Sequence, residues 1–127
     1  MTTQATTTHI GELTERTGLS LRTLGHYDEV GLVNASGRTE GGFRVYTESD
    51  YDRLMLIRRM KPLGFTLEEM AELLRIVDSA PAPGAAENRH ALNLFVEQAV
   101  QRREKLREQV AMADEFIELL KSQVPIR

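Results

Sequence analysis

The chain of 127 residues contains no cysteine and no tryptophan, and aromatic residues make up only 6% of it. Without cysteine the chain has no disulfide, no thiolate metal site and no cysteine redox switch. Its histidines His9, His26 and His90 are scattered and lack the spacing of metal ligands, so we expect no metal or other cofactor. We expect no enzyme either, because the sequence offers no nucleophile–base pair, phosphate-binding loop or metal cluster.

The sequence also lacks an apolar stretch long enough to cross a bilayer. The N-terminal MTTQATTTH is polar, with neither the basic nor the apolar segment of a signal peptide. We therefore expect a cytoplasmic protein that has no membrane partner.

Charge is distributed unevenly along the chain. The net charge is −3, with 16 basic and 19 acidic residues. Residues 1–64 hold eight of each sign, so the excess of acidic residues lies entirely in residues 65–127. A local basic face in the first half is compatible with this balance. The length suits one small domain with an appended element.

Capping signals predict two short helices after a flexible tail over residues 1–9. The first runs from about residue 10 to 16 and opens on a His9-x-x-Glu12 pattern that imitates a capping box. Thr17-Gly18-Leu19 then forms a brief turn, and Ser20 caps a second helix that ends near residue 29 or 30. Two helices joined in this way predict a helix-turn-helix motif.

A hairpin and two further helices complete a predicted domain over residues 10–77. Strand-forming residues 38–39 and 43–46 flank Glu40-Gly41-Gly42, which favours a β-hairpin in which Phe43 serves packing. Thr47-x-x-Asp50 opens a third helix to about residue 61, where Pro62 and Gly64 end it. Thr66-x-x-Glu69 opens a fourth helix to about residue 77.

The second half of the chain is interpreted as a linker over 78–87, one long helix over 88–121 and a tail over 122–127. The linker, DSAPAPGAAE, is unpatterned and contains proline. A helix of 34 residues is roughly 50 Å long and too long for this small domain to cover. Its apolar residues recur in steps of three and four, typical of a coiled coil with a partner chain. A helix folded back on residues 10–77 is the alternative. The seam consists of Leu92, Val96, Ala99, Arg103, Leu106, Val110, Ala113, Ile117, Leu120 and Val124. Arg103 is its polar member, which either sets the register of the two helices or extends its charged end into water.

Two segments, IGELTERTGLSLRTLGHYDEVGLV and RTEGGFRVYTESDYDRLMLIRRMKPLGFTLEEMAELL, carry a family resemblance. Together they resemble the N-terminal DNA-binding domain of the MerR family of bacterial transcriptional regulators over residues 10 to about 76. The resemblance implies a mainly α protein with a winged helix-turn-helix domain and an antiparallel dimerisation helix. It further implies a homodimer that bends and untwists a pseudo-palindromic promoter operator for RNA polymerase.

The second helix of such a motif is the one that usually enters the major groove. Arg22 and Thr23 fall in its first turn, next to the cap, where they can reach bases or phosphates. Tyr27 follows one turn later, and its alternative is a ring buried between helices with only its tip exposed. For Tyr46, packing in the hairpin is an equal alternative to DNA contact. The expected DNA-binding residues are Ser20, Arg22, Thr23, His26, Tyr27, Arg38, Arg44, Tyr46, Arg59 and Lys61.

Gly25 and His26 depart from the family pattern, in which Arg-Tyr-Tyr commonly stands where this chain has Gly25-His26-Tyr27. A glycine in an exposed helix interior costs roughly 1 kcal/mol relative to alanine. One hypothesis is that Gly25 permits closer approach of the helix to DNA while His26 takes over a phosphate contact. The other is that Gly25 is tolerated and DNA affinity is weaker.

Two other functions stay open at this point. The chain could be an architectural or excisionase-like DNA-bending protein, or a coiled-coil adaptor that binds no DNA. No cysteine lies near the end of the long helix, and about six residues follow Lys121, so we expect no dedicated ligand domain. The helical spacing of Phe95 and Phe116 favours packing over an effector pocket. The sequence does not identify an effector or the operator sequence, and it does not distinguish an activator from a repressor.

Overall fold

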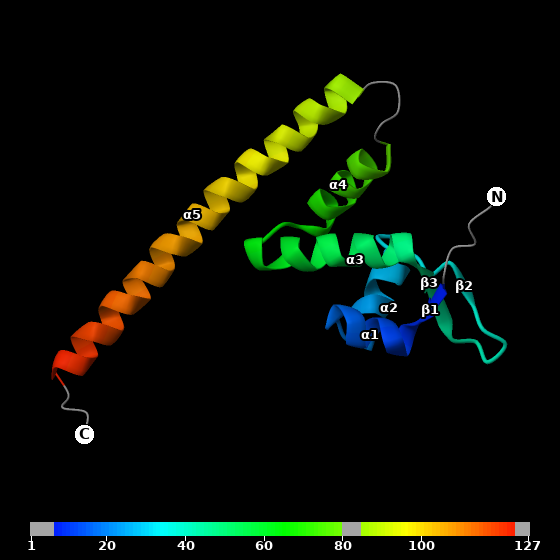
Figure 1. The fold of residues 1–127 in the computed structure, drawn as a ribbon, viewed down its shortest axis with the longest axis horizontal. Helices are drawn as coiled ribbons and strands as arrows, with labels where there is room; N and C mark the ends of the chain where they lie inside the picture. Colours follow the sequence, from blue (N-terminus) through cyan, green and yellow to red (C-terminus); the bar gives the residue numbers. More distant parts are fainter. Residues whose placement is uncertain (1–6, 80–84, 124–127) are drawn as a thin grey trace. The chain divides into compact units, whose positions relative to one another are not determined.

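The computed structural model describes residues 7–79 and 85–123, which fall into two units divided after Asp78 (Figure 1). The first unit contains α1 to α4 and a small sheet, and the second contains α5. The described part of the chain is mainly helical, with a β-hairpin wing in the first unit and a long C-terminal helix, as expected from the sequence.

The helix-turn-helix motif is formed by α1 (Ile10–Thr17) and α2 (Leu21–Glu29). Gly18 ends α1 with φ at 73°, a left-handed conformation that glycine adopts without steric cost. Leu13 and Leu24 are fully buried where the two helices pack. Both helices begin and end within a residue of the prediction, but His9 makes no side-chain cap bond, so α1 lacks the expected capping box.

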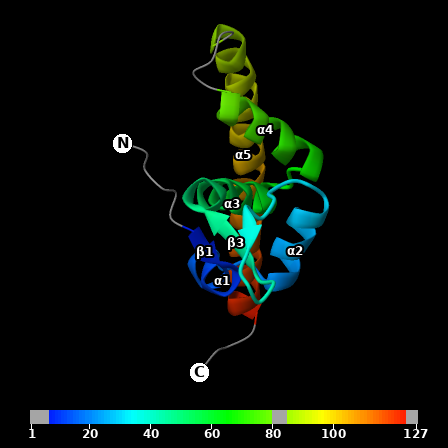
Figure 2. The same ribbon diagram turned by 90° about the vertical axis from the view of Figure 1, so that its right-hand side faces the viewer.

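A three-stranded antiparallel sheet flanks this motif, and its first strand was not predicted (Figure 2). The hairpin strands are β2 (Gly37–Arg38) and β3 (Arg44–Thr47). The other edge of β3 pairs with β1 (Thr7–His9), in which Thr8 lies opposite Tyr46. The expectation of a flexible tail is therefore wrong for residues 7–9, because the free edge of β3 supplies hydrogen-bond partners for their backbone. Residues 1–6 lie outside the described part.

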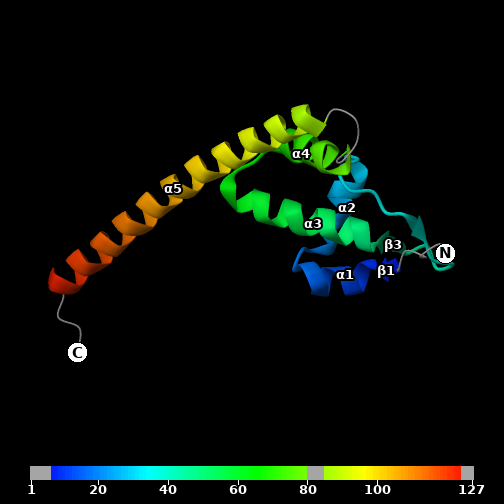
Figure 3. The ribbon, with the colours of Figure 1, turned by 45° about the horizontal axis from the view of Figure 1, so that its top comes forward.

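Helix α3 (Glu48–Met60) lies between α4 and α1 (Figures 1 and 3). Its capping box is formed as predicted: the Thr47 hydroxyl accepts from the Asp50 N–H, and the Asp50 carboxylate accepts from the Thr47 N–H. The 3-10 turn η1 (Lys61–Leu63) leads to α4 (Leu67–Ser79), where the Thr66–Glu69 box is also formed. The core includes Leu13, Leu24, Tyr46, Leu54, Ile57, Phe65, Met70 and Leu74.

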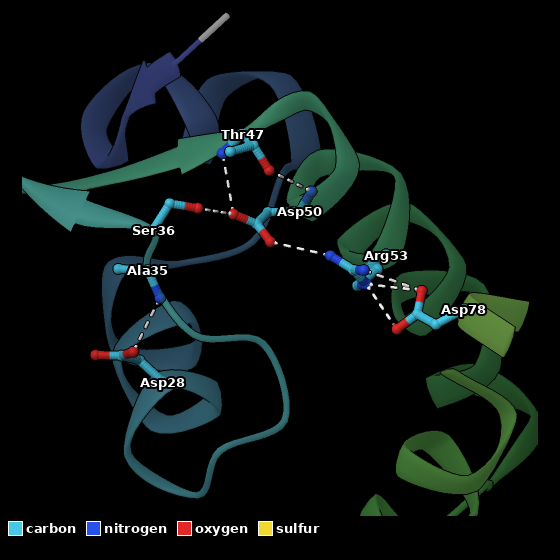
Figure 4. A network of polar contacts seen from close by, with 7 residues as sticks. All are labelled: Asp28, Ala35, Ser36, Thr47, Asp50, Arg53 and Asp78. Carbon is cyan, nitrogen blue, oxygen red and sulfur yellow. Dashed lines mark hydrogen bonds and ion pairs between the residues drawn. The ribbon is translucent and has the colours of Figure 1, made fainter. Parts of the chain in front are cut away.

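A chain of polar contacts joins the loop before the wing, the start of α3 and the end of α4 (Figure 4). The buried Asp50 carboxylate accepts from the Ser36 hydroxyl at 2.7 Å and from Arg53 Nη1 at 3.2 Å. Arg53 in turn donates from Nη2 to Asp78 Oδ1 at 3.0 Å and from Nε to both oxygens of Asp78. These contacts link segments that are far apart in the sequence.

The second unit is dominated by α5 (Ala85–Gln123), whose 39 residues correspond to roughly 58 Å of helix. Helix α4 extends to Ser79 and α5 begins at Ala85, so the predicted linker over 78–87 was too long at both ends. Its central residues 80–84, and residues 124–127 of the predicted tail with the seam residue Val124, lie outside the described residues. Among the helices described, none combines the length and apolar character needed to span a membrane.

Candidate nucleic-acid interface

The first turn of α2 is held by its cap and displays an arginine. The Ser20 hydroxyl oxygen accepts from the Thr23 N–H at 3.1 Å, and the same hydroxyl donates to Thr23 Oγ1 at 2.9 Å. This pairing satisfies one of the backbone donors at the start of the helix and engages both predicted polar side chains. Arg22 is exposed between them. The cap therefore sets where α2 begins and leaves Arg22 accessible at its N-terminal end.

An open hollow of about 760 Å³ lies along α2 and is also lined by residues of β3, η1 and the start of α4. Its cationic side chains are Arg22, Arg44 and Lys61, against one carboxylate from Glu29. The apolar part of the lining comes from residues that the sequence analysis had not assigned to a site, namely Phe65, Leu67 and Met70. Over residues 1–78, which form this first unit, the sequence holds nine basic and twelve acidic residues, yet three of these cations line the hollow. The hollow therefore presents cations that can neutralise the phosphates of a DNA backbone.

Arg44 reaches this hollow from β3 and is fixed by an ion pair with α2. Its Nε donates to Asp28 Oδ2 at 3.0 Å. The Asp28 carboxylate is itself anchored, since Oδ1 accepts from the Ala35 N–H at 3.0 Å and from Asn34 Nδ2 at 3.4 Å. The Ala35 N–H contributes most, ahead of Arg44 and Asn34, to holding the pKa of Asp28 below its usual value. Asp28 therefore stays ionised and holds Arg44.

The tip of the wing folds back on itself. Arg38 Nη1 donates to the Gly42 carbonyl at 2.9 Å, and Gly42 has φ at 82°, which a tight turn with glycine permits. Arg38 is exposed and so stays a candidate for DNA contact. Phe43 was expected to pack, but 63% of it is exposed, because it lies at the end of the short hairpin, away from the core.

Two predicted DNA-binding tyrosines are buried. Tyr46 is completely inaccessible, and its hydroxyl has no hydrogen-bond partner among the described residues. The expectation that Tyr46 contacts DNA is therefore wrong, because the side chain of Tyr46 is part of the core. Burial also raises the pKa of Tyr46. Tyr27 is 4% exposed, so its ring packs between helices, as in the alternative that the sequence left open, while one edge lines the hollow.

The remaining predicted DNA-binding residues lie on the surface. His26 is exposed on α2, with its ring centroid 6.3 Å from that of Tyr27. Arg59 and Lys61 are exposed at the end of α3 and in η1. Lys61 lines the hollow together with Arg22 and His26, whereas Arg59 and Arg38 are not among its lining residues. These surface residues remain predicted contacts.

The seam residues of α5 are accessible along much of the helix. Val96 and Val110 are 58% and 60% exposed, and the remaining large apolar residues of the C-terminal half of the seam, Leu106, Ile117 and Leu120, are exposed as well. Arg103 pairs with Glu104 on the same helix at 3.3 Å. Leu92 and Ala99 are half-buried, and Ala113 is exposed. An exposed apolar stripe of this length is unusual for a free surface.

The first unit, with its helix-turn-helix, its wing and the cations beside α2, defines a winged helix-turn-helix module of the DNA-binding type. The model of the MerR HTH family regulatory proteins matches residues 9–76, and the model described as "MerR, DNA binding" matches residues 51–122. The chain belongs to the MerR family of helix-turn-helix regulators.

Individual relatives agree with this assignment. The mercuric resistance operon regulatory protein of Bacillus cereus is 45% identical over 69 residues, which cover 54% of this chain and 52% of that protein. The chain spans about half the length, or less, of the curated relatives it matches. A crystal structure of a MerR-family transcriptional regulator from Bacillus cereus aligns with a TM-score of 0.63 at 27% identity, covering 96% of this chain and 87% of that one. The structure of HiNmlR, a MerR family regulator lacking the sensor domain and bound to promoter DNA, aligns with a TM-score of 0.59 at 25% identity, covering 93% and 87%.

Proposed function

We propose that the protein is a homodimeric, sequence-specific DNA-binding transcriptional regulator of the MerR type that acts in the cytoplasm. The observation that carries the proposal is the exposed first turn of α2, where Arg22 lies two residues after the cap and lines the same hollow as Arg44 and Lys61. An α-helix that displays an arginine at its N-terminal end fits the major groove, where arginine binds guanine or phosphate with a planar pair of donors. Family membership and the DNA complex of HiNmlR support this assignment.

The dimer in this proposal forms through α5. Its apolar stripe is exposed in the single chain, and burying each valine or leucine of such a stripe contributes roughly 1.5 to 3 kcal/mol. A second copy of the chain presents the same stripe, and the family resemblance implies an antiparallel pairing. Two copies of α2 would then bind half-sites about one helical turn of DNA apart.

The regulatory step we propose is deformation of a promoter. A dimer that binds two half-sites of a pseudo-palindromic operator can bend and untwist the DNA between them. This deformation changes the relative position of the promoter elements that RNA polymerase contacts. The wing and the end of α3 would hold the flanking backbone through Arg38, Arg44, Arg59 and Lys61.

Binding of the full chain to the promoter region upstream of its own gene tests the proposal. The parent chain should shift a duplex carrying an inverted repeat from that region at concentrations at which a shuffled duplex is unshifted. Arg22→Ala should weaken binding by about tenfold or more, the effect of losing one good base or phosphate contact. Arg75→Ala is the matched control, because Arg75 is an exposed arginine of the same unit that does not line the hollow.

Other results would replace this proposal. Equal binding to both duplexes with strong bending would indicate the architectural or excisionase-like function. Absence of binding at low salt would indicate a coiled-coil adaptor. In vitro transcription from the shifted promoter, with and without the protein, distinguishes activation from repression.

A further inference from the structure

The side chain of Arg44 lies along the face of α2 that contains Gly25. Its Nε is bonded to Asp28 Oδ2 at 3.0 Å, and its Nη1 lies 3.7 Å from the position that a Cβ on Gly25 would occupy. Gly25 and Asp28 are three residues apart and so are neighbours on one face of the helix. The guanidinium therefore extends from the carboxylate of Asp28 to the backbone of Gly25, which carries no side chain.

Gly25 does not serve a turn. Gly25 lies within α2, and it is not among the glycines with positive φ, so its backbone conformation is one that any residue can adopt. A Cβ alone would make an ordinary van der Waals contact with Nη1. A side chain branched at Cβ adds carbon atoms beyond this Cβ, next to the guanidinium of Arg44.

The outer nitrogens of Arg44 are available to a ligand. Within the part of the chain that the structure describes, neither Nη1 nor Nη2 donates a hydrogen bond. The side chain is 28% exposed and lines the same hollow as Arg22 and Lys61. An arginine whose Nε is engaged with a carboxylate keeps donors on both Nη atoms, and these suit the oxygens of a phosphate.

We propose that Gly25 and Asp28 together form a seat on α2 that holds Arg44 of the wing against the helix, so that its Nη atoms bind a phosphate of the DNA backbone. The inference rests on the proposed DNA-binding function. Asp28 supplies the charge that orients Arg44, and Gly25 supplies the space. Gly25 is thus a positioning residue, and the cation beside the middle of α2 comes from the wing instead of from the helix itself.

A double-mutant cycle on the full chain tests the seat. Fluorescence anisotropy with a duplex from the promoter region measures the dissociation constant at several KCl concentrations between about 50 and 200 mM. The chains compared are the parent, Gly25→Ala, Gly25→Ile, Arg44→Gln and the double variant Gly25→Ile/Arg44→Gln. Arg44→Gln should flatten the slope of log affinity against log salt by about one unit per subunit, because one phosphate contact is lost. Gly25→Ile should flatten the slope equally, and the double variant should match Arg44→Gln alone. Gly25→Ala should keep the parent slope.

Two controls separate the seat from effects on folding. Gly11→Ile makes the same change in α1, where nothing lies within 4 Å of the added Cβ, and should keep the parent slope. Alanine and isoleucine both favour a helix more than glycine does, so circular dichroism at the assay temperature should show both Gly25 variants folded.

The outcomes are distinct. Additive losses from Gly25→Ile and Arg44→Gln, or a parent slope in Gly25→Ile, would overturn the role of Gly25. A weaker Arg44→Gln with an unchanged slope would overturn phosphate as the ligand and indicate a base edge. If the parent chain binds no duplex at low salt, the proposed function itself fails, which is a different result from binding with additive losses.

Discussion

Arg53 on α3 holds Asp78 near the end of α4, with Nη2 3.0 Å from Oδ1 (Figure 4). The same guanidinium contacts Asp50 Oδ1 at 3.2 Å, so one arginine bridges two carboxylates. Hydrogen bonding to Asp78, the larger contribution, and attraction to Asp50 raise the pKa of Arg53. The two carboxylates differ in burial, because the side chain of Asp50 is 9% exposed and that of Asp78 is 46% exposed.

This difference in burial predicts unequal costs of mutation within one network. Asp50→Ala should lower the free energy of unfolding by about 2 kcal/mol, because it removes the capping box and leaves the Ser36 hydroxyl without its partner. Asp78→Asn should cost less than about 1 kcal/mol, since the pair is partly solvated. Urea unfolding followed by circular dichroism measures both, and equal costs would contradict the assignment.

Asp28 predicts a dependence of stability on acid. Its folded pKa lies below the unfolded value, so its contribution is complete above the unfolded pKa of about 3.9 and is lost as the pH falls through the folded value. Asp28→Asn should lower the free energy of unfolding by about 1.5 to 3 kcal/mol at neutral pH, the range for a hydrogen bond to a charged group. The parent and the variant should begin to converge as the pH falls below about 4, and the difference should vanish below the folded pKa of Asp28. Urea titrations at a series of pH values measure the difference, and a difference that stays constant into acid would refute the role of the carboxylate charge.

The buried hydroxyl of Tyr46 predicts a substitution without cost. Tyr46→Phe should leave the free energy of unfolding unchanged or raise it by up to about 1 kcal/mol, because the hydroxyl is buried with no partner among the described residues. DNA affinity should be unchanged, since the ring is inaccessible. Thermal melts and anisotropy titrations measure the two quantities, and weaker DNA binding with unchanged stability would restore Tyr46 as a contact.

The exposed stripe on α5 predicts the oligomeric state. The parent chain should sediment as a dimer at micromolar concentration, and Val110→Glu should weaken the dimer by at least about tenfold, because each dimer contains two copies of a buried valine worth roughly 1.5 kcal/mol or more. Lys105→Glu also places a glutamate on an exposed part of α5, but outside the seam, and should leave the dimer intact. Sedimentation velocity measures all three chains, and a monomeric parent would exclude the seam as a dimer interface.

The sequence alone determined where most helices begin and end. The caps of α2, α3 and α4 are contacts between residues three apart, as in Ser20 with the Thr23 N–H, and they form wherever the local chain permits. The hairpin likewise follows from glycines in its own turn. The same local signals identified Arg22 and Lys61 as surface cations, because residues of these types are seldom buried without a partner.

Only the tertiary structure decided which distant residues meet. Arg44 and Asp28 are separated by 16 residues, and no local pattern indicates that a wing arginine lies over Gly25. The pairing of Thr7–His9 with β3 and the burial of Tyr46 in the core depend on the path of the whole chain. The physical reason is that local hydrogen bonds are specified by short spacings, whereas packing and ion pairs between elements depend on how those elements come together in three dimensions.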